Sequence, residues 1–272
     1  MQLSPSPILA DVIKHFLILE SNFSAGTCHR MFSDGNTGIV FNFSDPLLHQ
    51  EAGSKKNAVL PQSFVYGQLD AYQNIIAKGK FGLIIAVFHP YGSSAFLKLP
   101  ATELKNEIID SGCFFGNKTD LLLEKIQERG DIYSRIKVVE NFLIVNRKTQ
   151  HYSGTIATEA VRLIHLHHGN LPINSLLSNL QISERQLQRT FEEHIGISPK
   201  RYSGLTRIQF FLKLLRNRPL ETSLTSLGYD SGFYDQAHLI RELKNISGIT
   251  PKQYISQNPP LAANLVPITP VK

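Results

Sequence analysis

The stretch Ser183–Tyr202 reads SERQLQRTFEEHIGISPKRY, and it returns in altered form over Asp235–Tyr254 as DQAHLIRELKNISGITPKQY. The two copies align without gaps at a constant offset of 52 residues, with seven identical positions. Because a repeat at fixed spacing marks a duplicated structural unit, this pair decides the fold of the C-terminal half.

Each copy has the signals of a helix with a defined start and a defined end. Ser183 and Asp235 are residue types that cap helix N-termini. Gly196 and Gly248 stand where a helix ends in a left-handed residue. A Ser-Pro or Thr-Pro pair follows two residues later and begins the next helix.

A short amphipathic run precedes each copy, over Ile173–Leu180 and from Leu224 to Gly228. Each unit is therefore helix, tight turn, helix, and we expect Ser183–Ile195 and Asp235–Ile246 each to enter a DNA major groove. Arginine reads guanine there and glutamine reads adenine. The residues that we predict to bind DNA are Arg185, Gln186, Gln188, Arg189, Gln236, Ala237, His238 and Arg241. The alternative for the two repeated arginines is a surface ion pair with Glu193 or Glu242.

The repeat closely resembles the DNA-binding domain of AraC/XylS-type transcriptional regulators. The resemblance covers roughly Thr155–Gln257 and rests on these matches: Ser183-x-Arg185-x-Leu187-x-Arg189-x-Phe191, Gly196-x-Ser198-Pro199-x-x-Tyr202, Arg207, Gly232-Phe233-Tyr234-Asp235, His238-Leu239-x-Arg241 and Gly248-x-Thr250-Pro251-x-x-Tyr254. It implies two helix-turn-helix motifs joined by a long helix, over Pro199–Leu215. The chain departs from the family at Leu177, Gly228 and Phe211, where alanine is usual.

The net positive charge of the chain is concentrated in the part that contains the repeat. The net charge is +6, and Thr155–Lys272 holds 13 Lys and Arg against 8 Asp and Glu. The preceding part holds 15 against 14, so the basic excess lies with the repeat, as binding to DNA phosphates requires.

Composition and motifs narrow the class of protein. At 272 residues, the chain is long enough for two domains. No apolar run reaches the roughly 18–20 residues of a membrane span, and the N-terminus lacks the features of a signal peptide. Cys28 and Cys113 form no metal or redox motif, and nucleophile elbows and phosphate loops are missing. We therefore predict a cytoplasmic protein that is no enzyme, has no metal site or other cofactor, and does not bind membranes.

The N-terminal part reads as β-rich. Gly38–Ser44 alternates apolar and polar residues, and Lys78-Gly79-Lys80 separates two strand-like runs as a hairpin turn would. We predict an α+β chain: a β-rich sandwich or barrel domain over 1–110, a helical segment and candidate dimerisation element over 111–148, a linker over 149–154, an all-α tandem helix-turn-helix domain over 155–257, and a flexible tail over 258–272.

The N-terminal sequence also resembles the cupin-like domain found ahead of some AraC-type DNA-binding domains. The matching segments are His29-Arg-Met-Phe-Ser-Asp34-Gly35, Ser63-Phe-Val-Tyr-Gly67-Gln68-Leu69, Phe88-His89-Pro90-x-Gly92 and Ala95-Phe96-Leu97. The resemblance implies a sensor for a small-molecule effector and dimerisation through this region. His29 and His89 are speculative ligand-binding residues at the mouth of the β-domain.

The sequence thus predicts a sequence-specific transcriptional regulator controlled through its N-terminal domain. Its expected partners are double-stranded DNA, a small-molecule effector, RNA polymerase and a second copy of the chain. Two alternatives stay open: a metal-dependent cupin-type enzyme tethered to a DNA-binding module, and an interaction module that has lost DNA readout.

Overall fold

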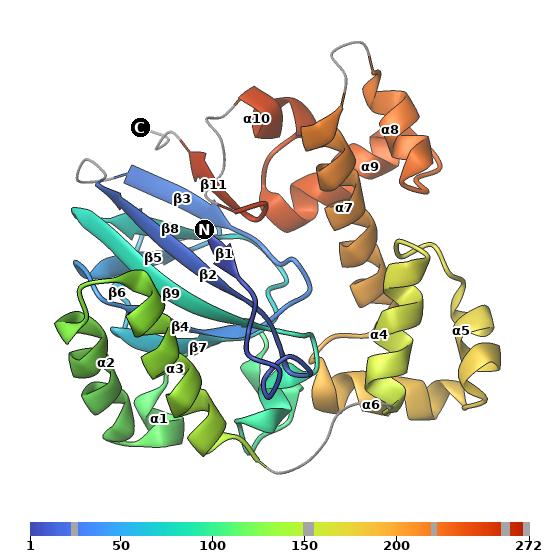
Figure 1. The fold of residues 1–272 in the computed structure, drawn as a ribbon. Helices are drawn as coiled ribbons and strands as arrows, with labels where there is room; N and C mark the ends of the chain where they lie inside the picture. Colours follow the sequence, from blue (N-terminus) through green and yellow to red (C-terminus); the bar gives the residue numbers. More distant parts are fainter. Residues whose placement is uncertain (23–26, 149–154, 219–221, 257–261, 269–272) are drawn as a thin grey trace.

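The structure is a computed structural model that describes residues 1–22, 27–148, 155–218, 222–256 and 262–268. In these residues, a β-sandwich with three helices on one side lies against a domain built of seven helices (Figure 1). The predicted linker, 149–154, lies outside the described residues.

Two antiparallel sheets form the sandwich. The first has six strands in the order β1 (Gln2–Leu3), β2 (Ile13–Asn22), β9 (Lys80–Phe88), β4 (Gly38–Asn42), β7 (Ser63–Tyr66) and β10 (Ile108–Asp110). The second has five in the order β11 (Leu265–Ile268), β3 (Thr27–Met31), β8 (Gln73–Ala77), β5 (Leu47–Glu51) and β6 (Ala58–Val59).

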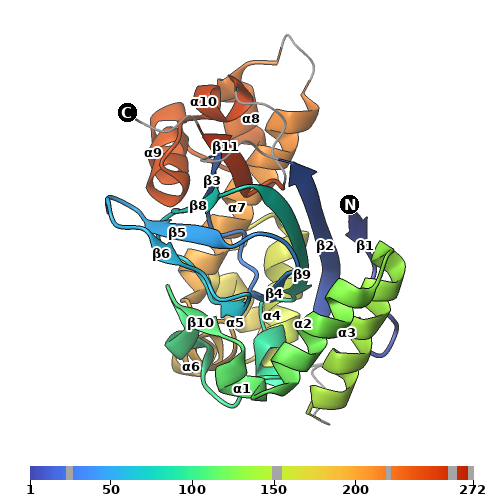
Figure 2. The same cartoon turned by 90° about the vertical axis from the view of Figure 1, so that its left-hand side faces the viewer.

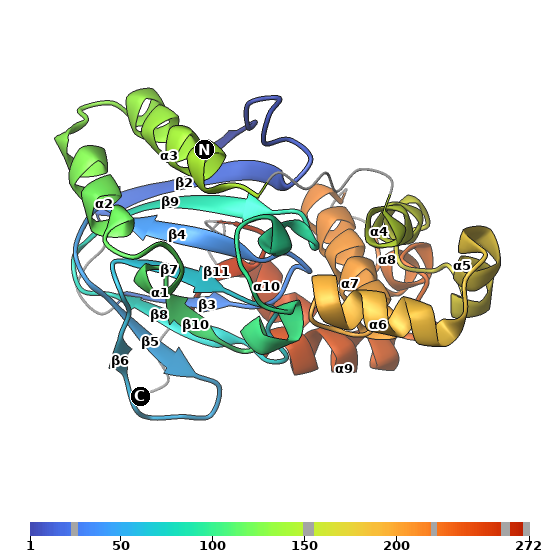
Figure 3. The same cartoon turned by 90° about the horizontal axis from the view of Figure 1, so that it is seen from below.

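Successive side chains of β9 point into two separate hydrophobic cores. Leu83 and Val87 face the space between the sheets, whereas Ile84 and Ala86 face outward. The outward face is covered by α1 (Gly112–Phe115), α2 (Lys118–Glu128) and α3 (Ile132–Asn146), and Figure 3 shows α2 and α3 next to each other along the outside of the strands. Two short 3₁₀ turns, η1 (Gly92–Ala95) and η2 (Ala101–Leu104), point toward the helical domain.

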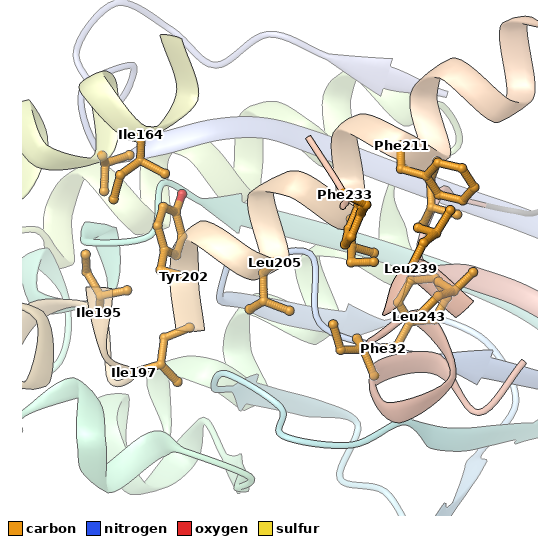
Figure 4. Close-up of a cluster of buried hydrophobic side chains, with 14 of the residues drawn as sticks. Phe32, Ile164, Ile195, Ile197, Tyr202, Leu205, Phe211, Phe233, Leu239 and Leu243 are labelled. Atoms are coloured by element: carbon orange, nitrogen blue, oxygen red, sulfur yellow. The ribbon is translucent and has the colours of Figure 1, made fainter. Parts of the chain in front are cut away.

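The helical domain consists of α4 (Ile156–Leu166), α5 (Ile173–Leu180), α6 (Glu184–His194), α7 (Pro199–Asn217), α8 (Leu224–Asp230), α9 (Gln236–Ser247) and α10 (Pro251–Ser256). With 19 residues, α7 spans about 28 Å and joins the two halves of the repeat. Figure 4 shows the shared core around it, into which Phe32 of the β-domain also packs.

The end of the chain differs from the predicted flexible tail. Residues 265–268 form β11, an edge strand of the second sheet, next to β3 (Figure 2). The prediction counted prolines as a sign of flexibility. Pro267 is nevertheless compatible with a strand here. Proline has no backbone N–H to donate, and on the outer side of an edge strand no neighbouring strand needs that hydrogen bond.

Candidate nucleic-acid interface and interdomain cavity

The first repeat folds as a helix-turn-helix through α5 and α6. Gln181 adopts the left-handed conformation, with φ of 54°, and ends α5. The Ser183 side chain then accepts a hydrogen bond from the Gln186 backbone N–H at 3.2 Å, which caps α6 as the sequence predicts.

The second repeat reaches the same arrangement through α8 and α9. Gly232, with φ of 81°, makes the turn. The Asp235 carboxylate accepts a hydrogen bond from the His238 backbone N–H at 2.6 Å. The Thr225 hydroxyl donates to the Gln236 side chain at 3.2 Å, which joins α8 to the first turn of α9.

The predicted DNA-binding residues all lie on α6 and α9. Five are exposed: Arg185, Arg189, Gln236, Ala237 and Arg241. Gln186, Gln188 and His238 are half-buried. Within the described chain Arg189 and Arg241 make no ion pair, so their guanidinium groups are available to a partner.

Intrahelical contacts engage two of the half-buried residues. Gln188 donates to Glu192 at 2.8 Å, and the His238 Nε2 atom lies 3.3 Å from Glu242 Oε1. Glu242, the acid considered as a partner for Arg241, is thus beside His238 instead.

The three departures from the family pattern fit the helical packing. Leu177 is partly buried against the core, and Phe211 is fully buried within it. A Cβ atom at Gly228 would lie 3.4 Å from the Leu239 side chain, an ordinary contact distance. These residues therefore leave the helix-turn-helix geometry intact.

The ends of both recognition helices rest on the β-domain at repeat-equivalent glycines. A Cβ at Gly196, where φ is +87°, would lie 2.5 Å from the Ala101 carbonyl oxygen. A Cβ at Gly248, where φ is +69°, would lie 2.3 Å from the Tyr72 ring. The sequence predicts both glycines as helix ends, but no sequence signal marks them as points of contact between domains.

A cavity of about 660 Å³ runs from between the two sheets to the helical domain. Its inner part is apolar, with Val40, Leu47, Phe64, Ile75, Phe81 and Leu83 among the lining residues. Its lining also includes polar and charged residues from both domains: Lys14, His15, Asp34, His165, His168, Gln209 and Lys213. The site therefore combines an apolar interior with exposed lysines from two domains.

His165 lies in the cavity lining near other basic side chains. Desolvation, followed by the positive charge of Lys14, lowers the pKa of His165 to about 4. Its Nε2 atom lies 2.6 Å from the Tyr202 hydroxyl. The lining also holds two lysines, Lys14 from the β-domain and Lys213 from α7.

His29 and His89 do not line the cavity. His29 lies on β3 and is 1% exposed, and burial lowers its pKa to about 4. The Nε2 atom of His89 lies 3.3 Å from the Ala10 carbonyl, and its ring stacks on Tyr91. Their role in ligand binding stays a prediction. Lys14 and Lys213, which no sequence signal marks, line one cavity because the two domains meet there.

Two further findings concern the described residues alone. They contain no group of three or more His, Cys, Asp or Glu side chains placed to hold a metal ion. None of their helices combines the length and apolarity needed to cross a membrane.

Two known families match this chain, one in the β-domain and one in the helical domain. Residues 1–110 match a family described as a domain of unknown function (DUF6597), and residues 176–257 match the helix-turn-helix domain family. An uncharacterized HTH-type transcriptional regulator of Haemophilus influenzae is 29% identical over 82 residues. The match covers 30% of this chain and 27% of that relative.

Solved structures of ToxT from Vibrio cholerae share the two-domain fold. One, from strain O395, is 9% identical, with a TM-score of 0.52 over 88% of this chain and 96% of the other. A second holds (E)-4-(8-methylnaphthalen-1-yl)but-3-enoic acid and is 10% identical, with a TM-score of 0.50 over 88% and 98%. The fold is thus a β-rich domain followed by a helix-turn-helix domain.

Proposed function

We propose that this chain, with its AraC-type tandem helix-turn-helix domain, is a sequence-specific DNA-binding transcriptional regulator. The observation that carries the proposal is the pair Arg189 and Arg241. They occupy the same repeat position on two capped helices, and both are exposed and free of ion pairs within the described chain. The α6 and α9 helices would read neighbouring major-groove segments of one site, about one helical turn apart.

The test is selection of bound fragments from randomised DNA by the full-length protein, followed by affinity measurements across a salt series. We expect a motif of two half-elements. A protein that contacts roughly 6–10 phosphates should lose about 10³–10⁵ in affinity between about 50 and 200 mM salt. Folded protein that shows no salt-dependent affinity for DNA would contradict the proposal and favour a pure interaction module.

The cavity is the proposed effector site, and its chemistry suits an apolar molecule with an acidic group. The apolar interior would take the hydrophobic part, and Lys14 and Lys213 would attract the acid. The carboxylic acid bound to ToxT supports the same class of ligand.

Calorimetry with that naphthalenyl butenoic acid tests the effector site. Relative to the unchanged chain, we expect Lys213→Ala and Lys14→Ala each to weaken binding by about tenfold, the loss of one charge-assisted contact. Lys56→Ala, at an exposed lysine away from the cavity, is the matched control. Equal affinity in all three variants would place the acid elsewhere.

The remaining assignments belong to the same proposal. We place the protein in the cytoplasm, where DNA is accessible, and assign it no catalytic activity. A second copy of the chain and RNA polymerase are its proposed protein partners. Light scattering of the full-length protein, alone and with selected DNA, tests the dimer.

A further inference from the structure

The chain returns to the β-domain after it has completed the helix-turn-helix domain. β11 pairs with β3 in antiparallel register, from Leu265 opposite Met31 to Ile268 opposite Cys28. Just before the strand, Asn264 and Phe32 exchange two hydrogen bonds, of 3.0 and 3.1 Å. The second sheet is therefore completed by a segment more than 230 residues away in sequence.

Successive side chains of β11 enter two different cores. Leu265 is 7% exposed and packs in the core between the sheets. Val266 is 1% exposed and packs in the core of the helical domain, together with Phe32. Because neighbouring side chains of a strand point to opposite faces, this one short strand joins both domains.

The same segment is attached to the end of the second motif. The Tyr254 hydroxyl of α10 donates to the Ala263 carbonyl at 2.9 Å. On the partner strand, Arg30 lies opposite Val266 and donates to the Gly248 carbonyl at the end of α9, at 3.3 Å. The first motif rests on the β-domain elsewhere, through contacts of α6 with η1 and η2.

The segment also forms part of the cavity wall. The lining includes Ala262, Ala263, Asn264 and Leu265, together with residues of the sandwich interior. A molecule in the cavity would therefore touch a segment that is bonded to α10.

We propose that Ala262–Ile268 is a C-terminal latch that holds the second helix-turn-helix motif on the β-domain and transmits the state of the cavity to that motif. The first motif is held independently of it. The regulatory meaning rests on the proposed function, but the existence of the latch does not.

Hydrogen exchange of the full-length chain and of a chain ending at residue 261 tests the latch without DNA or ligand. We expect amides of α8, α9 and α10 to exchange about tenfold faster or more in the shortened chain, while those of α5 and α6 change by less than about twofold. A chain ending at residue 268 keeps β11 and should match the full-length protein. No change in α8–α10, or an equal change in both motifs, would overturn the proposal.

If the shortened chain fails to fold, an engineered disulfide in the full-length chain provides a second test of the latch. Ile268→Cys places a thiol directly across the ladder from Cys28, within the separation of roughly 4.4–6.8 Å that disulfides span between Cα atoms. With Cys113→Ser to remove the exposed thiol, oxidation should slow exchange in α8–α10 more than in α5–α6. Equal slowing in both motifs, or none, would overturn the latch.

A unique fluorophore tests transmission from the cavity. The chain contains no tryptophan, so Leu265→Trp reports on the latch alone, and the adjoining cavity offers room for the larger ring. Binding of the naphthalenyl butenoic acid should change its emission and slow exchange in α8–α10. Val59→Trp, at a residue that is 64% exposed, should not respond. Acid binding by calorimetry without a response at Leu265→Trp would overturn the coupling while leaving the effector site intact.

Discussion

In the first helix-turn-helix motif, α6 ends at Gly196 against a backbone carbonyl of η2, whereas in the second, α9 ends at Gly248 against the Tyr72 ring. The two motifs share their caps, their glycine stops and their repeated arginines. They differ in what surrounds them, because in the described structure Tyr254 joins the second to the segment that leads into β11. A duplicated sequence can thus specify two similar helical units while the rest of the fold gives them different neighbours.

The largest expected effect tests the two contact points directly. Gly196→Ala should lower the free energy of unfolding by about 3 kcal/mol, since left-handed strain adds to a clash with a backbone carbonyl that cannot rotate away. Gly248→Ala should cost less, about 1.5–2 kcal/mol, because the Tyr72 side chain can move.

Urea unfolding measures both variants. Gly53→Ala is the matched control, because Gly53 has φ of +76° and a Cβ atom added there would meet nothing within 4 Å beyond its chain neighbours. This variant therefore reports the left-handed strain alone. If Gly196→Ala lowers the free energy of unfolding by no more than Gly53→Ala does, the close contact with Ala101 contributes nothing to the effect.

Acid should loosen the second motif through β3. Burial lowers the pKa of His29 from 6.5 to about 4, so the unfolded chain binds a proton that the folded chain rejects. The corresponding stability is complete above pH 6.5 and is lost as the pH falls toward about 4, by roughly 2–3 kcal/mol for this residue. His165, on α4 beside the first motif, acts with the same sign.

Urea unfolding at several pH values measures this loss. His29→Asn should flatten the dependence between pH 6.5 and 4 without abolishing it, because His165 still titrates. An unchanged slope would show that His29 remains accessible to protons in the folded protein.

The two arginines should show whether both motifs read DNA. Arg189→Ala and Arg241→Ala should each weaken binding to the selected site by about 1–3 kcal/mol and relax base preference in different half-elements. Arg129→Ala, at an exposed arginine between α2 and α3, controls for the loss of a positive charge. Fluorescence anisotropy with labelled duplexes measures all three. An effect at only one of the two positions would show that a single motif reads sequence.

The smallest expected effect concerns the turns. The first motif uses Gln181 at φ of 54°, where the second uses Gly232 at 81°. Gln181→Gly should relieve left-handed strain and raise stability by at most about 0.5–1 kcal/mol, because glycine also increases the entropy of the unfolded chain. A loss of stability in thermal unfolding would show that the Gln181 side chain contributes more than the turn requires.

Local signals explain why the helical half was predictable. Caps such as Ser183, stops such as Gly196 and the apolar spacing of Leu187 and Phe191 act within one or two helical turns. The β-rich class of the N-terminal part followed likewise from alternation in runs such as Gly38–Asn42. The positions of Lys14 and Lys213 in one cavity were not predictable, because no periodic signal links residues so far apart in sequence.

Local sequence signals were enough to predict the two capped recognition helices, the residues on their exposed faces and the division into a β-rich and a helical part. They were enough because hydrogen bonds to caps and burial of one apolar stripe depend on neighbours a few residues away. Tertiary structure alone decided that Leu265 and Val266 complete a sheet and enter two cores, and that repeat-equivalent glycines meet different surfaces. Strand pairing and domain contacts depend on which distant edges meet, and Pro267 can belong to a strand only because β11 lies at an edge.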